Sequence, residues 1–69
     1  MTVKEFCELK LKEYPDGIWV GVHYPSGYFG GEIYLDEYYM TEFVGILDQE
    51  VTKWYLDDCD YEILEIWIK

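Results

Sequence analysis

Only a few residues in this chain could act as a nucleophile and its base. His23 is the single histidine, and Cys7 and Cys59 are the two cysteines. A cysteine nucleophile needs a base within hydrogen-bonding distance, and no local pattern places either thiol beside His23. The residues around His23 alternate as in a strand. The sequence therefore favours His23 as an ordinary sheet residue over a Cys–His dyad, and it identifies no catalytic residue.

The densest carboxylate cluster consists of Asp57, Asp58 and Asp60. Mg²⁺ and Ca²⁺ prefer oxygen ligands, so these three aspartates are weak candidates for a metal site. The spacing lacks the glycine and the distal glutamate of an EF-hand loop, and aspartate is common in turns. A solvated turn is the favoured interpretation, and we expect no metal site and no cofactor.

A second group of side chains suits binding. Tyrosine offers a large contact area at low entropic cost, and carboxylates can pair with the arginines of a partner. Both types occur together between residues 32 and 42. The residues expected to contact a partner are Glu32, Tyr34, Asp36, Glu37, Tyr38, Tyr39 and Glu42. Alternatively, the tyrosines cover a thin core and the acids keep the protein soluble; the two interpretations are compatible.

These side chains must be positioned by a helix and several strands. Thr2 and Glu5 fit a capping box at the start of an amphipathic helix of about three turns, and Pro15 ends it. The apolar arc of this helix consists of Val3, Phe6, Cys7, Leu9, Leu11 and Tyr14. Alternating residues predict strands at 18–24, 28–36, 50–56 and 61–68.

The elements predict an α+β fold in a single domain, residues 1–69. The N-terminal helix packs on a small, mainly antiparallel sheet of about four strands, and a short helix fits between the second and third strands. That short helix is expected to be capped by Thr41 and to carry Phe43, Val44, Ile46 and Leu47.

The last predicted strand is largely apolar on both faces, so each face must be shielded from water by another part of the protein or by a partner. One face packs on the helix, and the other, with Trp19, Trp54 or Trp67, is expected to meet another copy. The closing strand is also expected to be an exposed pairing edge. Because so short a chain has a limited core, we expect a homo-oligomer.

Charge and composition narrow the function. The formal net charge is −10, and no lysine or arginine lies between Glu13 and Thr52. Such a field repels phosphates and attracts basic protein surfaces, so direct nucleic-acid binding and binding to anionic membranes are disfavoured. The three Trp, eight Tyr and three Phe indicate a folded domain rather than a disordered acidic tail. Without a signal peptide or a long apolar run, we expect a cytoplasmic protein with reduced thiols.

The order of three segments resembles short accessory proteins of phages and bacterial mobile elements, including anti-CRISPRs. These segments are Thr2-Val3-Lys4-Glu5-Phe6, Leu47-Asp48-Gln49-Glu50-Val51 and Ile63-Leu64-Glu65-Ile66-Trp67-Ile68. Some proteins of this kind are acidic mimics of DNA. One type resembles a small helix-plus-sheet coactivator that binds single-stranded DNA, and it acts on DNA topology. No motif residue carries over from either group, and the present chain lacks a basic sheet face.

The leading hypothesis is a small, non-catalytic phage or mobile-element protein of the host cytoplasm. It would inhibit a basic, nucleic-acid-binding defence protein, such as a nuclease, by DNA mimicry or by covering its surface. One alternative is an oligomeric DNA-acting protein that binds single strands or nicks supercoiled DNA with a metal held by Asp57, Asp58 and Asp60. Another is a structural, self-assembling module.

Overall fold

Local signals set the bounds of the first helix. In the computed structural model, which describes residues 1–69, helix α1 spans Val3–Glu13. The Thr2 hydroxyl accepts a hydrogen bond from the Glu5 N–H at 3.2 Å, and the Glu5 carboxylate accepts one from the Thr2 N–H at 2.9 Å. This is the predicted capping box. Gly17, with a φ of 94°, turns the chain into the first strand.

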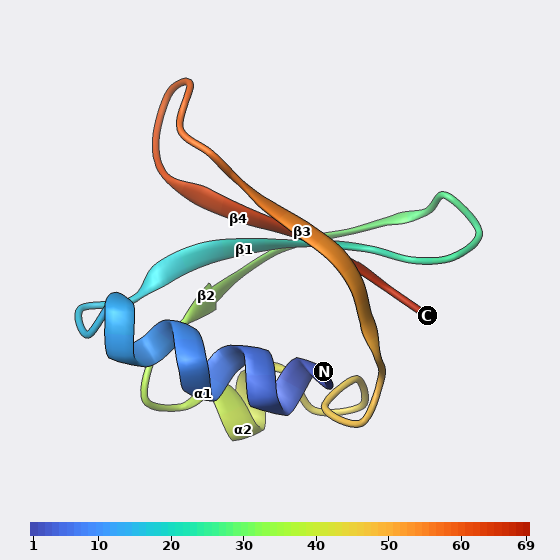
Figure 1. Cartoon of the computed structure of the whole chain (residues 1–69), viewed down its shortest axis with the longest axis horizontal. Coiled ribbons are helices and arrows are strands. Elements are labelled where there is room, and N and C mark those ends of the chain that lie inside the picture. Colours follow the sequence, from blue (N-terminus) through green and yellow to red (C-terminus); the bar gives the residue numbers. More distant parts are fainter.

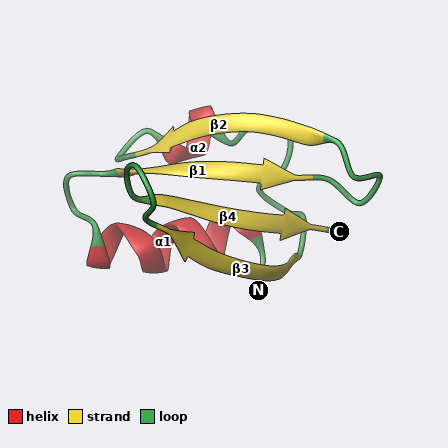
Figure 2. Ribbon diagram, turned by 90° about the horizontal axis from the view of Figure 1, so that it is seen from above, coloured by secondary structure: helices red, strands yellow, loops and turns green.

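Four strands and one further helix follow. They are β1 (Ile18–His23), β2 (Phe29–Leu35), α2 (Tyr39–Glu42), β3 (Val51–Asp57) and β4 (Ile63–Ile68). The strands form one sheet in the order β2-β1-β4-β3 (Figure 2). The β1–β2 and β3–β4 pairs are antiparallel, whereas β1 and β4 are parallel. The predicted α+β fold, with its short helix between the second and third strands, is confirmed.

Both helices lie on the same side of the sheet (Figures 1 and 2). The face beneath them holds the core, because β-strand residues alternate between faces. The buried cluster consists of Val3, Phe6, Cys7, Ile18, Val20, Val22, Leu35, Phe43, Leu64, Ile66 and Ile68. The opposite face, which we call the open face, carries no helix.

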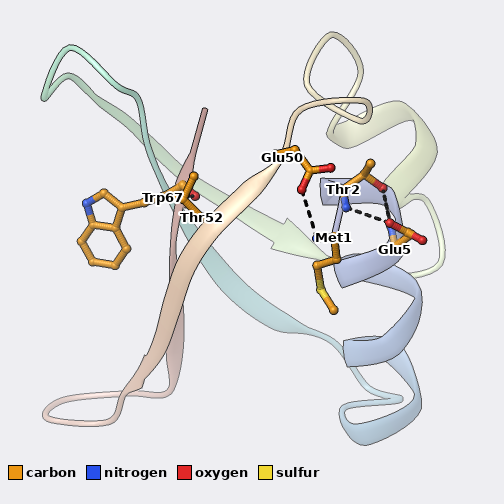
Figure 3. A network of polar contacts seen from close by, with 6 residues as sticks. All are labelled: Met1, Thr2, Glu5, Glu50, Thr52 and Trp67. Carbon is orange, nitrogen blue, oxygen red and sulfur yellow. Dashed lines mark hydrogen bonds and ion pairs between the residues drawn. The ribbon is translucent and has the colours of Figure 1, made fainter.

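The start of β3 is tied to the N-terminus. The Val51 N–H donates to the Met1 carbonyl at 2.8 Å, Thr2 and Glu50 form an antiparallel bridge, and the Met1 amino group lies 3.1 Å from the Glu50 carboxylate (Figure 3). The N-terminus and the start of β3, which are far apart in the sequence, thereby hold each other in place. The Thr52 hydroxyl also donates to the Trp67 carbonyl at 3.1 Å.

The position of the closing strand corrects a prediction. β4 is a central strand between β1 and β3, so it is not an exposed pairing edge. Its apolar residues on both faces suit a central strand, because side chains of β1 and β3 flank each face of β4. The free edges of the sheet belong to β2 and β3.

Three local predictions were also wrong. The second helix spans Tyr39–Glu42 and is not capped by Thr41; the chain then turns through Gly45, whose φ is 92°. On α1, Leu9 is exposed and Lys10 is buried. Trp54 lies on the helix side of the sheet, where its ring makes an edge contact with Phe6 at a centroid distance of 5.5 Å.

Candidate binding surface

The open face is organised in three rows that run across the four strands. Strand alternation and the pairing register place side chains from β2, β1, β4 and β3 beside one another. The first row is Phe29, His23, Trp67 and Lys53. The second is Glu32, Gly21, Glu65 and Tyr55. The third is Tyr34, Trp19, Ile63 and Asp57.

Aromatic rings connect the first row. The His23 ring stacks on Trp67 at a centroid distance of 4.3 Å and lies 4.9 Å from Phe29. Trp67 in turn stacks on Tyr55 at 5.6 Å, and the Lys53 ammonium lies 4.4 Å from its ring. Figure 3 shows the Trp67 indole on the side of the sheet away from α1. A continuous aromatic platform therefore crosses the sheet; it consists of Phe29, His23 and Trp67 of the first row and Tyr55 of the second.

The second row places carboxylates beside the aromatic rings. The Glu65 carboxylate lies 2.7 Å from His23 Nε2. Gly21 makes this possible, because a Cβ there would collide with the Glu65 carboxylate. Glu32 accepts hydrogen bonds from the Tyr61 hydroxyl at 2.9 and 3.0 Å. This hydrogen bond is the largest of the effects that raise the pKa of Tyr61.

The third row has a second aromatic pair. Trp19 and Tyr34 meet edge to face at 5.1 Å, and the Tyr34 hydroxyl donates to the Asp16 carbonyl at 2.8 Å. The indole of Trp19 remains 40% exposed. Carboxylates of the second row therefore lie between two aromatic rows, and a ligand can contact both.

A small acidic hollow lies at the turn that joins β3 and β4. Its volume is about 140 Å³, and its lining is Glu32, Asp57, Cys59, Asp60, Tyr61, Ile63 and Glu65. No group of three or more histidine, cysteine, aspartate or glutamate side chains is placed to hold a metal ion. Asp57 instead accepts a hydrogen bond from the Cys59 N–H at 3.2 Å, as in an aspartate turn.

The thiols are not activated. Burial, the largest cause, raises the pKa of Cys7 to about 12. The pKa of Cys59 is also raised, chiefly by its hydrogen bond to Asp57 and the charge of that carboxylate. Nucleophilic cysteines need a lowered pKa. The hydrogen-bonding partner of His23 is Glu65, not a thiol.

The seven predicted contact residues fall into two groups. Glu32 and Tyr34 lie on the open face, whereas Asp36, Glu37, Tyr38, Tyr39 and Glu42 lie at the corner between β2 and α2. In that corner the Tyr39 hydroxyl donates to Glu8 of α1 at 3.1 Å, and Glu42 is partly buried. Glu37 and Tyr38 are exposed.

The predicted contact residues did not include Phe29, Trp67 or Glu65, and Trp67 was expected only at a contact with another copy. The alternation within β1 places Trp19, Gly21 and His23 on one face of that strand. The alternation within β4 likewise places Ile63, Glu65 and Trp67 on one face. What was missing was the parallel pairing of these two strands, which joins the two sets.

None of the helices is long and apolar enough to cross a membrane. Comparison with protein-family models, curated proteins and solved structures finds no match to this chain.

Proposed function

We propose that this protein is a non-catalytic inhibitor that covers the basic, nucleic-acid-binding surface of another protein. The partner expected from the resemblance to anti-CRISPRs is a nuclease of a bacterial defence system, met in the host cytoplasm. The open face is the docking surface, and Glu32 and Tyr34 are the predicted contact residues that lie on it. Glu37 and Tyr38 extend the contact at its rim.

The observation that carries this proposal is the pairing of exposed aromatic rings with carboxylates that lack a cation of their own. Only three ion pairs form in a chain of net charge −10, and only His23–Glu65 lies on the open face. Glu32, Asp57 and Asp60 have no such partner. The only lysine in the three rows is Lys53.

This combination suits arginine. A guanidinium group stacks on aromatic faces and binds carboxylates through two parallel hydrogen bonds. A surface that binds nucleic-acid phosphates is rich in such groups. The acidic field of the whole chain would also accelerate its encounter with a basic partner.

The test uses an octa-arginine peptide as the probe. We expect the peptide to bind the protein and to shift the amide resonances of the open face in NMR spectra. Glu32→Lys should weaken binding by about tenfold, since it replaces a carboxylate of the open face with a positive charge. Asp48→Lys is the matched control, because Asp48 is exposed in the loop before β3 and outside the three rows.

Two results would reject the proposal. One is the absence of binding to any basic probe at low salt. The other is equal weakening by Glu32→Lys and Asp48→Lys, which would indicate that net charge alone attracts the peptide and that no surface is selected.

The aromatic platform also supports a second candidate, the binding of single-stranded nucleic acid. Bases stack on aromatic rings of a sheet with little sequence preference, and the aromatic platform of Phe29, His23, Trp67 and Tyr55 is such a surface. The carboxylates of the second row oppose it. Titration with an oligothymidylate at low salt decides between the two: quenching of tryptophan fluorescence that is lost in Trp67→Ala would favour nucleic acid over a basic protein.

A further inference from the structure

Strand β3 has a free edge of defined length. Its first residues are covered, since Val51 donates to the Met1 carbonyl and Glu50 bridges to Thr2. From Lys53 to Asp57 the only backbone partner is β4. Three consecutive large side chains along this stretch are exposed: Trp54 by 43%, Tyr55 by 50% and Leu56 by 38%. An unpaired edge of this kind is a template for another strand.

The sequence of this edge is complementary to itself. When the stretch Lys53-Trp54-Tyr55-Leu56-Asp57 is laid antiparallel to an identical copy and centred on Tyr55, each Lys53 lies opposite an Asp57. Each Trp54 then lies opposite a Leu56, and the two Tyr55 rings meet at the centre. Directly opposed residues in an antiparallel pair interact, and opposite charges there are favourable.

We propose that a second copy of this chain pairs with the β3 edge in this register. The contact is two-fold symmetric, as in most homodimers. Lys53, Tyr55 and Asp57 lie on the open face, and Trp54 and Leu56 lie on the helix face, so both sides of the joined sheet gain apolar contacts. Registers centred on Trp54 or Leu56 place Lys53 or Asp57 opposite Tyr55 and lose the ion pair.

Charge favours this edge over other parts of the surface for contact between two copies. Each chain carries −10, so two chains repel each other. The stretch Lys53–Asp57 contains one lysine and one aspartate and is locally neutral. The Lys53 ammonium lies over the Trp67 ring, and its flexible stem and three N–H donors allow it to reach an aspartate across the new strand pair.

The dimer goes beyond the proposed function. Pairing of the two β3 edges joins two four-stranded sheets into one. Because the pairing keeps residues of equal orientation opposite each other, both open faces lie on one side and all helices on the other. The two aromatic platforms then form one extended surface with two-fold symmetry.

Sedimentation equilibrium of the full chain tests the proposal. We expect the wild-type mass to approach twice the 8.3 kDa of one chain as concentration rises. Lys53→Asp and Asp57→Lys should each raise the dimer dissociation constant by about tenfold or more, since two symmetry-related pairs change from attraction to repulsion. The double variant Lys53→Asp/Asp57→Lys should restore the wild-type constant, and far-UV circular dichroism of the single variants checks that they fold.

Asp57→Lys is the variant that best separates the proposed register from an effect of net charge. This substitution makes the chain less negative, so net charge alone would lower the dimer dissociation constant. In the proposed register it places two lysines opposite each other, which raises that constant. Lys12→Asp and Asp48→Lys carry the same charge changes at exposed positions outside the edge and should show only the net-charge effect. A monomer at all concentrations would overturn the proposal. So would single variants that match their controls, or a double variant no better than the single ones.

Discussion

Glu42 is held in an environment that opposes its ionisation. Its Oε1 atom is buried without a hydrogen-bond partner. Burial is the largest cause of the raised pKa of Glu42, followed by a hydrogen bond to Asp36 and the charge of that carboxylate. The protonated carboxyl can donate to Asp36, whereas the ionised one is repelled by it. The folded state therefore binds a proton at Glu42 more readily than the unfolded chain does.

This environment predicts a stabilising substitution. Since the folded pKa lies above the unfolded value of 4.5, ionisation of Glu42 destabilises the fold as pH rises through the folded pKa. Glu42→Gln should raise the free energy of unfolding at pH 7, and the gain should disappear as pH falls toward 4.5. Urea denaturation of the two proteins across this pH range measures the difference.

Glu37→Gln is the matched control for Glu42→Gln, since Glu37 is an exposed neighbour and loses the same charge. Any gain that it shows reflects reduced net charge only. Equal gains for the two variants, or a gain at Glu42 that persists at pH 4, would contradict the proposed effect of burial and of Asp36.

Lys10 shows what residue patterns could not predict. The helical arc correctly indicated that Val3, Phe6 and Cys7 are buried, but it placed Leu9 inside and left Lys10 as an interruption. The Lys10 ammonium lies 3.8 Å from the Trp54 ring and 3.0 Å from the Glu13 carboxylate. The indole of Trp54, far along the chain, creates a site for both the aliphatic stem and the charge of Lys10. The residue pattern of the helix contains no information about this distant contact.

At the level of elements, the turn between α1 and β1 depends on Gly17. Its φ of 94° is strained for other residues, and a Cβ there would lie 2.8 Å from the Leu35 carbonyl oxygen, which is backbone and cannot move aside easily. Gly27, in the turn between β1 and β2, has a similar φ of 88° but open space around it.

The two glycines give a matched pair. Gly27→Ala should cost about 1 kcal/mol of stability because of its backbone conformation alone. Gly17→Ala should cost roughly 1–3 kcal/mol more, because the added methyl group overpacks the β2 end. Chemical denaturation measures both. Equal losses would indicate that the contact with Leu35 is relieved without energetic cost.

The elements themselves were largely predictable, but their order in the sheet was not. The capping box at Thr2, the Asp16-Gly17 turn and the alternation along the strands are local signals. The parallel pairing of β1 with β4 is a contact between distant segments, and no local signal encodes it. The sequence therefore placed His23 and Trp67 in strands without bringing the two residues together, and the closing strand was wrongly expected at an edge of the sheet.

On the scale of the whole molecule, negative charge is poorly compensated. The three ion pairs involve the N-terminal amino group, Lys10 and His23. Two of the carboxylates in these pairs, those of Glu50 and Glu13, are more than half exposed, so they contribute little to stability. Self-repulsion consequently opposes compaction, and a cationic partner would relieve it.

Repulsion of this kind predicts that salt stabilises the fold. Screening shortens the range of interactions between exposed charges to about 10 Å at 0.1 M ionic strength. The melting temperature should therefore rise from low to moderate NaCl, measured at a protein concentration at which the chain is monomeric. The variant Glu37→Lys/Asp48→Lys, with two exposed charges reversed, should melt higher at low salt and gain less from added NaCl. A melting temperature that falls with salt, or equal gains for both proteins, would mean that attractive pairs outweigh the net charge.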